Sequence, residues 1–166
     1  MDIQLTQADL EAIAAEVGAR LEAREQFLVT AESCTGGWVG QCLTAIAGSS
    51  HWFDRGFVTY SNVAKVETLG VPKTTLVRHG AVSEATARAM AEGALRQCAK
   101  AHWSLAITGV AGPGGGSEAK PVGTVCFAWA ERDGGCVAET CLFAGDRAAV
   151  RAQSVKHALA GLLTRL

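Results

Sequence analysis

The sequence predicts an α/β protein, a three-layer α/β/α sandwich built on a mixed β-sheet, in a single domain spanning residues 1–166. Short apolar, β-branched segments alternate with longer segments of helical periodicity, which is the pattern of parallel strands covered by helices. The segment Asp133-Gly134-Gly135 between the last two strand-like segments is a hairpin signal, so we expect an antiparallel pair there. The sequence contains neither an internal repeat nor a linker, and 166 residues suffice to bury one core.

The first half of the chain is expected to hold three helices and two strands. Thr6 and Asp9 resemble a capping box ahead of an amphipathic segment, which predicts a helix over 7–24. The apolar segment "FLVTA" predicts a buried strand over 27–31. By the same criteria we expect a helix over 35–47, a strand over 53–60, and a short helix over 63–70 capped at 61–62.

The second half continues the alternation. Ser83 is a suitable N-cap for an alanine-rich helix over 84–101, and "WSLAIT" predicts a buried strand over 103–108. A glycine-rich loop, "GVAGPGGGSEAKPVG", follows that strand. The remaining expected elements are strands within 124–131 and 136–145, on either side of the hairpin, and a helix over 146–165.

The composition argues against several classes of protein. With 15 basic and 16 acidic residues the net charge is −1, so no overall field attracts nucleic acid or an anionic membrane. The N-terminus lacks the basic and apolar regions of a signal peptide, and no segment approaches the roughly 18 apolar residues of a membrane span. We therefore expect a cytoplasmic protein that binds a small molecule and neither nucleic acid nor membrane. The sequence permits a homodimer or a higher homo-oligomer without requiring one.

The six cysteines include no C-x-x-C pair, which argues against a zinc knuckle or a dithiol redox motif. Most of them lie in apolar segments, where a free cysteine behaves as a small hydrophobic residue. We expect reduced, structural thiols, with Cys34 as the exception to weigh. No spacing typical of metal ligands is visible, so we expect neither a metal ion nor a cofactor.

A candidate reaction centre lies at the join "ESCTGG" between the strand over 27–31 and the helix that follows. Ser33 is expected at the carboxyl edge of the sheet, followed by free backbone N–H groups at a helix N-terminus. Those groups could stabilise the oxyanion formed when Ser33 attacks a carbonyl, and the amides of Thr35 and Gly36 are the candidates. The alternative is that Ser33 or Thr35 acts only as a helix N-cap.

A serine nucleophile requires a base, and the four histidines are scattered in contexts that do not suggest one. Tyr60 ends a predicted strand, and Lys65 lies in the first turns of a predicted helix. Both could point into the crevice at the strand ends, where ligands bind in open α/β sheets. A lysine near a helix N-terminus and other cations has its charged form disfavoured, so Lys65 is a candidate base toward Ser33. A solvated surface lysine is the alternative.

Two further segments are candidates for substrate binding. The loop that includes Thr108, Gly109 and Gly112 follows a buried strand, but it matches neither a Walker A motif nor a Rossmann fingerprint. Arg147 and Arg151 are four residues apart near a helix N-terminus, so a phosphate would meet two guanidinium groups and free N–H groups. A flexible surface loop and a solvated charged face are the corresponding alternatives.

Together these segments resemble the CinA C-terminal domain family over nearly the whole chain, roughly residues 10–165. The matching motifs occur in order and are "AESCTGG", "GSSHWFDRGFVTYSNVAK", "GAVSE", "AITGVAGPGGGSEAKPVGTV", and "GDR" followed by "VR". The resemblance implies a three-layer α/β/α fold. Stand-alone members of the family are nicotinamide-nucleotide amidases. The resemblance therefore implies hydrolysis of nicotinamide mononucleotide to nicotinate mononucleotide and ammonia, in pyridine-nucleotide recycling.

The resemblance also implies roles for individual residues. The family's serine nucleophile falls on Ser33, its lysine base on Lys65, and its tyrosine beside the reacting group on Tyr60. The family's substrate-holding arginine falls on Arg147. Whether the glycine-rich loop, Arg147 or Arg151 binds the 5′-phosphate stays open. The larger CinA proteins carry an additional N-terminal domain, whose activity is not implied for this chain.

Three alternatives remain at this stage. Cys34 could be the nucleophile of the same reaction, since a helix N-terminus lowers the pKa of a cysteine. A nucleotide-binding regulatory module without turnover would need the glycine-rich loop and the arginines but not Lys65. A Ser–Lys amidase could also act on a different amide, such as a peptide or another nucleotide.

Overall fold

A five-stranded mixed β-sheet, with strand order β2-β1-β3-β4-β5, forms the centre of the protein in a computed structural model that describes residues 4–166. Strand β1 runs parallel to both of its neighbours, the central strand β3 and the edge strand β2. Antiparallel pairing then adds the hairpin β4–β5 that Asp133-Gly134-Gly135 predicts. The strands are β1 (Leu28–Glu32), β2 (Phe53–Val58), β3 (Trp103–Gly109), β4 (Thr124–Glu131) and β5 (Cys136–Leu142).

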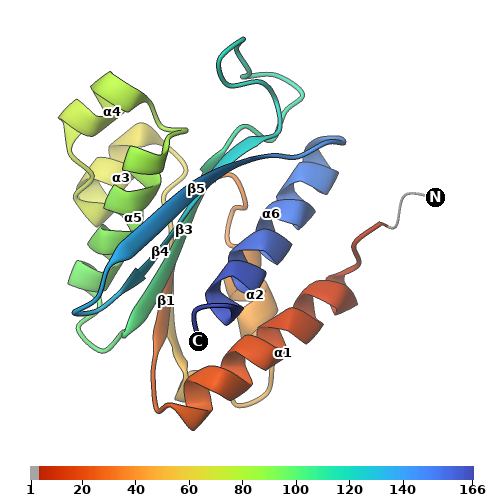
Figure 1. Cartoon of the computed structure of the whole chain (residues 1–166), viewed down its shortest axis with the longest axis vertical. Coiled ribbons are helices and arrows are strands. Elements are labelled where there is room, and N and C mark those ends of the chain that lie inside the picture. Colours follow the sequence, from red (N-terminus) through yellow and green to blue (C-terminus); the bar gives the residue numbers. More distant parts are fainter. Residues whose placement is uncertain (1–3) are drawn as a thin grey trace.

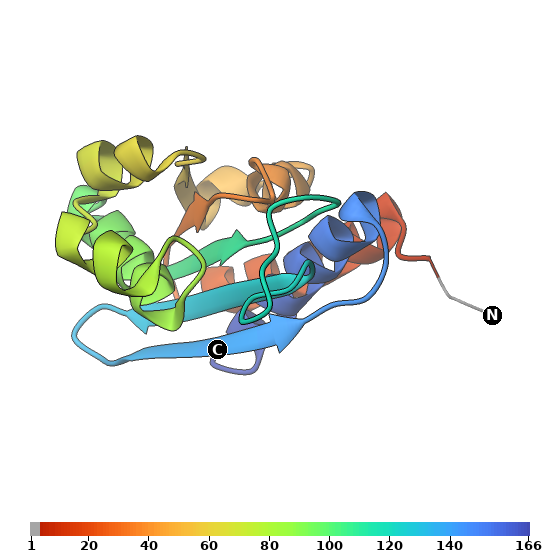
Figure 2. The same cartoon turned by 90° about the horizontal axis from the view of Figure 1, so that it is seen from above.

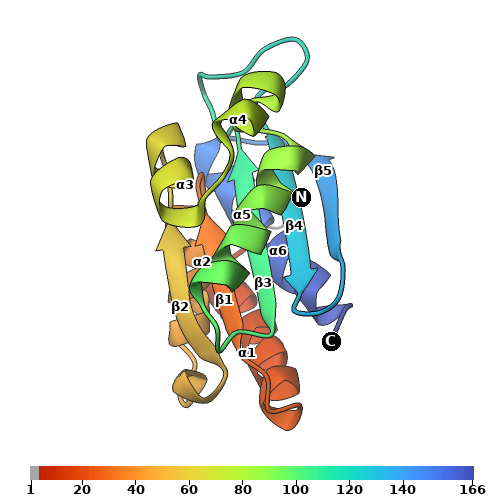
Figure 3. The ribbon, with the colours of Figure 1, turned by 90° about the vertical axis from the view of Figure 1, so that its left-hand side faces the viewer.

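Helices cover both faces of the sheet, so the predicted three-layer α/β/α sandwich is confirmed (Figure 1; Figure 2). One outer layer contains α1 (Gln7–Ala23), α2 (Trp38–Thr44) and α6 (Arg147–Leu163). The other layer contains α3 (Asn62–Leu69), α4 (Lys73–His79) and α5 (Glu84–Gln97), and Figure 3 shows α5 lying along the sheet. A single 3-10 turn, η1 (Ser49–His51), precedes β2.

The strands feed two separate cores because successive side chains point to opposite faces of a sheet. In β3, Leu105 and Ile107 pack with α1, α2 and α6, whereas Ala106 packs on the other side. The α5 side is rich in alanine, and a Cβ on Gly93 of α5 would lie 2.0 Å from the carbonyl oxygen of Leu69. Small side chains therefore allow α3 and α5 to approach each other closely.

Several predicted caps are confirmed. Thr6 and Asp9 form a capping box on α1, in which the Asp9 N–H donates to Thr6 Oγ1 and the Thr6 N–H donates to the Asp9 carboxylate. Ser61 caps α3 and Ser83 caps α5, each by accepting a hydrogen bond from the third helical N–H. All six cysteines are free thiols, as predicted.

The predicted helix over 35–47 is wrong at both ends, since α2 spans only Trp38–Thr44. Gly36 and Gly37 have φ values of 62° and 99°, in the left-handed region that favours glycine, and α2 begins only at Trp38. The predicted helix over 84–101 ends at Gln97, and the last strand ends at Leu142. Helix α4 is not among the elements predicted from the sequence, because it has no buried residue and so no apolar stripe marks it.

The parallel pairing determines where a site can form. The carboxyl ends of β1, β2 and β3 meet at one edge of the sheet, because Glu32 is paired with both Val58 and Ile107. Ligands of open α/β sheets bind at this edge. Among residues 4–166, no helix combines the length and apolar character that a bilayer crossing requires.

Candidate active site

Ser33 and Lys65 lie in direct contact at the carboxyl edge of the sheet. Ser33 follows β1, and Lys65 is the fourth residue of α3, which is separated from the end of β2 by three residues. The Lys65 Nζ atom lies 2.9 Å from Ser33 Oγ. Two residues that are 32 positions apart in sequence are thus joined by a hydrogen bond, as the predicted nucleophile–base pair requires.

The environment of Lys65 favours its neutral form. Its side chain is 1% exposed, and burial lowers the pKa of Lys65 from 10.5 to about 8. The prediction of a destabilised charge is confirmed in direction, but the cause is burial and not the helix N-terminus or neighbouring cations. Nζ also donates to the carbonyl oxygens of Thr59 at 2.7 Å and Tyr60 at 3.2 Å.

These two carbonyl contacts orient the amine. A neutral amine has two N–H bonds and one lone pair, so donation to Thr59 and Tyr60 leaves the lone pair directed at Ser33. In that state Lys65 can accept the Ser33 hydroxyl proton. Within the described residues, no histidine is hydrogen-bonded to Ser33, whose hydroxyl partners are Lys65 and the Tyr60 carbonyl.

Cys34 is placed unfavourably for chemistry. It is 6% exposed and belongs to the core beneath α1, α2 and α6. Burial raises the pKa of the Cys34 thiol to about 11, which outweighs the lowering effects of its own backbone N–H and of Arg151. The helix N-terminus therefore does not lower the pKa of this thiol below its usual value, which argues against the alternative of Cys34 as the nucleophile.

Glu32, which the sequence analysis did not single out, organises the turn that holds Ser33. Its carboxylate is 1% exposed and accepts hydrogen bonds from the N–H groups of Val39 and Gly40, at 2.9 and 3.0 Å. It also accepts one from Thr35 Oγ1 at 2.6 Å. A buried carboxylate thus fixes residues 32–40 by capping α2, a role predicted for Ser33 or Thr35. The only feature of the sequence that could have indicated this role of Glu32 is its position as an acidic residue at the end of a buried strand.

The backbone of the turn offers fewer free donors than the sequence suggests. The Gly36 N–H donates to the Ser33 carbonyl oxygen at 3.0 Å, and the Trp38 N–H donates to Thr35. Among the residues that the structure describes, the Thr35 N–H has no hydrogen-bond partner, and the Cys34 N–H donates to no other residue. Of the two predicted oxyanion donors, Thr35 is therefore available and Gly36 is engaged.

Arg151 holds the same turn from α6. Its Nε and one terminal nitrogen donate to the carbonyl oxygens of Cys34 and Thr35, at 3.0 and 3.1 Å. Its guanidinium group also lies 5.4 Å from the centre of the Trp38 ring. Because these contacts engage the fork of the guanidinium group, Arg151 has a positioning role in this structure.

Arg147 links Tyr60 to the glycine-rich loop. It donates to the Gly112 carbonyl oxygen at 2.7 Å and to the Tyr60 hydroxyl at 3.3 Å. Tyr60 is 63% exposed. Its backbone carbonyl oxygen contacts Ser33 and Lys65, whereas its side-chain hydroxyl contacts Arg147, so Tyr60 connects the pair to this arginine. The Asp146 carboxylate accepts a hydrogen bond from the Ala149 N–H, so the N-terminus of α6 is less free than predicted.

A cavity of about 620 Å³ lies between the glycine-rich loop and the start of α6. Its size suits a mononucleotide, since small-molecule sites typically measure about 300–1,000 Å³. The two arginines of α6, Arg147 and Arg151, both line this cavity. Its lining includes Ala111, Pro113, Val122, Asp146, Arg147 and Arg151.

The start of the glycine-rich loop is packed, not open to a ligand. Thr108 is 1% exposed, and its hydroxyl donates to the Ala81 carbonyl oxygen at 2.8 Å. A Cβ on Gly109 would lie 2.8 Å from Val125, and one on Gly112 would lie 2.4 Å from Val122. These three residues shape the loop, and only the Gly112 carbonyl reaches the arginine side of the cavity.

The chain is similar to proteins of one family over almost its whole length. The model of the CinA C-terminal domain matches residues 10–166. A protein named nicotinamide-nucleotide amidohydrolase PncC, from Escherichia coli strain K12, is 52% identical over 155 residues, which cover 93% of each chain. A putative competence-damage inducible protein of Symbiobacterium thermophilum is 51% identical, and the match covers 92% of this chain but 38% of that protein. The crystal structure of competence/damage inducible protein CihA from Agrobacterium tumefaciens superposes with a TM-score of 0.92 at 42% identity, covering 99% and 98% of the two chains.

Proposed function

Because this chain belongs to the CinA C-terminal domain family, we propose that it is an amidohydrolase that converts nicotinamide mononucleotide and water to nicotinate mononucleotide and ammonia. Relatives that match it end to end, at 52% identity, are named nicotinamide-nucleotide amidohydrolase. The single observation that carries the proposed mechanism is the 2.9 Å contact between Lys65 Nζ and Ser33 Oγ. The reaction would serve pyridine-nucleotide recycling.

In the first step Ser33 Oγ attacks the carboxamide carbon while its proton passes to the neutral amine of Lys65. The carbonyl contacts of Thr59 and Tyr60 support this transfer, because they hold the lone pair of Lys65 toward Ser33. The substrate carbonyl oxygen becomes an oxyanion, for which the Thr35 N–H is the available donor of the predicted pair. Losing one such donor typically costs about 3 kcal/mol of transition-state stabilisation.

Collapse of the tetrahedral intermediate breaks the carbon–nitrogen bond. The proton on Lys65 goes to the leaving nitrogen, so ammonia departs and an ester to Ser33 remains. Lys65 is then neutral again and takes a proton from a water molecule that attacks the ester carbon. Breakage of the ester returns the Lys65 proton to Ser33 and releases the product as a carboxylic acid. The acid then passes its proton to the departed ammonia through solvent, which leaves nicotinate and ammonium and balances the reaction.

The cavity between the glycine-rich loop and α6 supports binding of the nucleotide end of the substrate. Arg147 is exposed and carries a fixed positive charge, and it lies within reach of both the loop and Tyr60. A 5′-phosphate would replace the Gly112 carbonyl as its acceptor, since bonds between charged partners are stronger than bonds to a neutral carbonyl. We assign the phosphate to Arg147 in preference to Arg151, whose guanidinium group already holds the Ser33 turn.

Ammonia release from nicotinamide mononucleotide tests the proposal. Ser33→Ala removes the nucleophile, so kcat should fall by at least about 1,000-fold. Cys34→Ala is the matched control: it removes the neighbouring thiol from the same turn, and catalysis should survive it.

Other outcomes would change the assignment. Full activity of Ser33→Ala combined with inactivity of Cys34→Ala would transfer the nucleophile to the thiol. Binding of the mononucleotide to the unsubstituted protein without ammonia release would identify a nucleotide-binding module without turnover. Equal cleavage of nicotinamide riboside and its mononucleotide would contradict the phosphate assignment, because the riboside lacks the group that Arg147 binds.

A further inference from the structure

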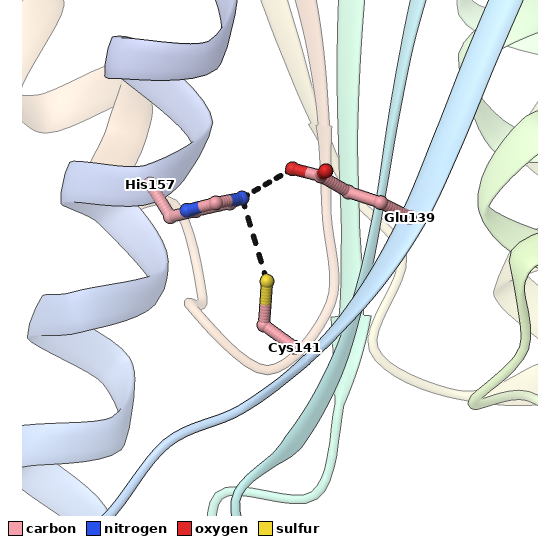
Figure 4. A group of neighbouring side chains, drawn as sticks. All are labelled: Glu139, Cys141 and His157. Carbon is pink, nitrogen blue, oxygen red and sulfur yellow. Dashed lines mark hydrogen bonds and ion pairs between the residues drawn. The ribbon is translucent and has the colours of Figure 1, made fainter.

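Three potential metal ligands meet between the edge strand β5 and helix α6, outside the site described above. Glu139 and Cys141 are two residues apart on β5, so they project from the same face of the strand. His157 lies on α6 and points at both of them (Figure 4). One ligand atom from each residue lies within 4.8 Å of the others, and the Cys141 sulfur is 3.4 Å from His157 Nε2.

Both partners approach the same nitrogen of His157. Glu139 is hydrogen-bonded to Nε2, and the Cys141 sulfur contacts that atom too. A ring nitrogen carries at most one hydrogen, so Nε2 cannot donate fully to both neighbours. A catalytic Cys–His–Glu relay would place the acid on Nδ1 and the thiol on Nε2. The convergence on one atom therefore argues for a shared cation and against a second hydrolytic centre.

The histidine ring is held in place before any ligand binds. Its centre lies 4.6 Å from that of Phe127, and 6.0 Å from those of Trp129 and Phe143. These aromatic contacts fix the side-chain direction of His157 toward β5. A preorganised ligand loses less conformational entropy on binding, which favours a defined site over a chance encounter of surface groups.

We propose that Glu139, Cys141 and His157 form a binding site for a zinc ion, with water as the fourth ligand. Zinc accepts sulfur, nitrogen and oxygen ligands together, and tetrahedral geometry places its nitrogen and sulfur ligands about 3.6 Å apart. The 3.4 Å between Cys141 and His157 is close to that spacing. The side chains of His157 and Glu139 are 34% and 45% exposed, so an ion and a water molecule can reach them.

The zinc site is independent of the proposed amidase reaction. His157 lies ten residues after Arg147, which is about 15 Å along the helix axis. A bound ion would join the exposed edge strand to the helix that carries Arg147 and Arg151. On binding, the metal–sulfur bond replaces the sulfur–hydrogen bond of Cys141, and the thiol proton passes to water.

The test is metal binding by the full-length protein after treatment with a chelator. Zinc, titrated by calorimetry, should bind with one equivalent per chain, and Cys141→Ser or His157→Gln should weaken its affinity at least about tenfold. Cys136→Ser is the matched control, since Cys136 is a half-buried thiol on the same strand outside the cluster. The Cys136→Ser variant should bind zinc with the same affinity as the unsubstituted protein. Ser33→Ala should also bind zinc normally, so failure of this proposal and failure of the amidase proposal are distinguishable.

Cobalt provides a spectroscopic readout on the unsubstituted protein. The unsubstituted protein with Co²⁺ should show the absorption of a tetrahedral, thiolate-bound ion, and Cys136→Ser should retain it. Zinc should also raise the unfolding temperature of the unsubstituted protein, because a ligand that binds only the native state stabilises it. Absence of stoichiometric binding, or equal weakening by Cys136→Ser and Cys141→Ser, would overturn the proposal.

Discussion

Lys65 is 1% exposed and faces three oxygen atoms, none of which carries a full charge. Its hydrogen bonds can orient an ammonium group but provide no counter-charge, so burial dominates and the pKa of Lys65 falls to about 8. At the residue scale, this combination makes a lysine suitable as a base near neutral pH. A nearby carboxylate would have restored the usual pKa and removed that property.

The first prediction concerns the pH dependence of the amidase reaction. Only neutral Lys65 can accept a proton, so kcat/KM should fall about tenfold per pH unit as the pH decreases below about 8. Above that pH the rate should level off. The measurement is ammonia release from nicotinamide mononucleotide between pH 6 and about 9.5.

Lys65→Arg is the control for this profile. It keeps a positive hydrogen-bond donor in the site, but a guanidinium group cannot be deprotonated in proteins, so activity should be lost at every pH. A flat profile for the unsubstituted protein, or substantial activity of Lys65→Arg, would remove Lys65 from the role of base.

The sequence predicts the contact between Ser33 and Lys65 better than it predicts the residues around them. Ser33 and Lys65 could be singled out because each follows a recognisable strand end, and parallel strands bring such ends together. Glu32 could not be assigned a role, since the sequence does not specify which backbone amides a buried carboxylate will meet. Likewise, the spacing of Glu139, Cys141 and His157 gives no indication that β5 and α6 place them side by side.

At the scale of elements, the segment from β1 through the 33–37 turn into α2 behaves as one unit. Its conformation depends on two glycines in the left-handed region, the buried Glu32 carboxylate, and the Arg151 contacts from α6. Helical spacing in the sequence extends back to Thr35 and predicts a helix that begins there. Positive φ at Gly36 and Gly37 ends that continuity, and this backbone choice cannot be read from apolar periodicity.

A second prediction tests this unit through Glu32→Gln. The glutamine keeps the shape, but its NH₂ group cannot accept a hydrogen bond, so one of the α2 amides now bound by the carboxylate loses its acceptor. We expect the free energy of unfolding to fall by about 1–3 kcal/mol. Because the turn also positions Ser33, kcat should fall while KM for nicotinamide mononucleotide changes little.

Glu67→Gln is the matched control, an exposed acid on α3 whose neutralisation should leave both stability and kcat near their original values. Urea unfolding and steady-state kinetics of the two variants measure the difference. If Glu32→Gln lowered stability without affecting kcat, the carboxylate would support the fold alone and not the position of Ser33.

At the scale of the whole molecule, the site exists because separate parts of the chain end at one edge of the sheet. Ser33 follows β1, Lys65 lies on the helix after β2, and Arg147 begins α6. The sequence predicted this meeting from the alternation of strands and helices and from the CinA resemblance. The order of strands in the sheet, and with it the cavity beside the glycine-rich loop, required the structure, because strand pairing is a property of distant segments.

The buried lysine also makes the stability of the whole protein depend on pH. The native-state pKa of Lys65 is about 8, whereas the unfolded value is 10.5, so between these values the unfolded chain binds a proton that the native protein has lost. Stability therefore increases as the pH rises from about 8 to 10.5, and below pH 8 the full cost of burying the charge applies. A shift of this size corresponds to about 3 kcal/mol.

Lys65→Met isolates this effect, since it removes the charge and keeps a flexible side chain of similar reach. The free energy of unfolding of the variant, relative to that of the unsubstituted protein, should be highest at or below pH 7. This difference in free energy should shrink by about 3 kcal/mol as the pH rises to 10.5. Urea unfolding of both proteins at each pH gives the difference, in which the titration of groups common to both, including the cysteines, cancels. A difference independent of pH would mean that the native and unfolded states hold the Lys65 proton equally well. Burial could then not be what prepares this lysine to accept a proton from Ser33.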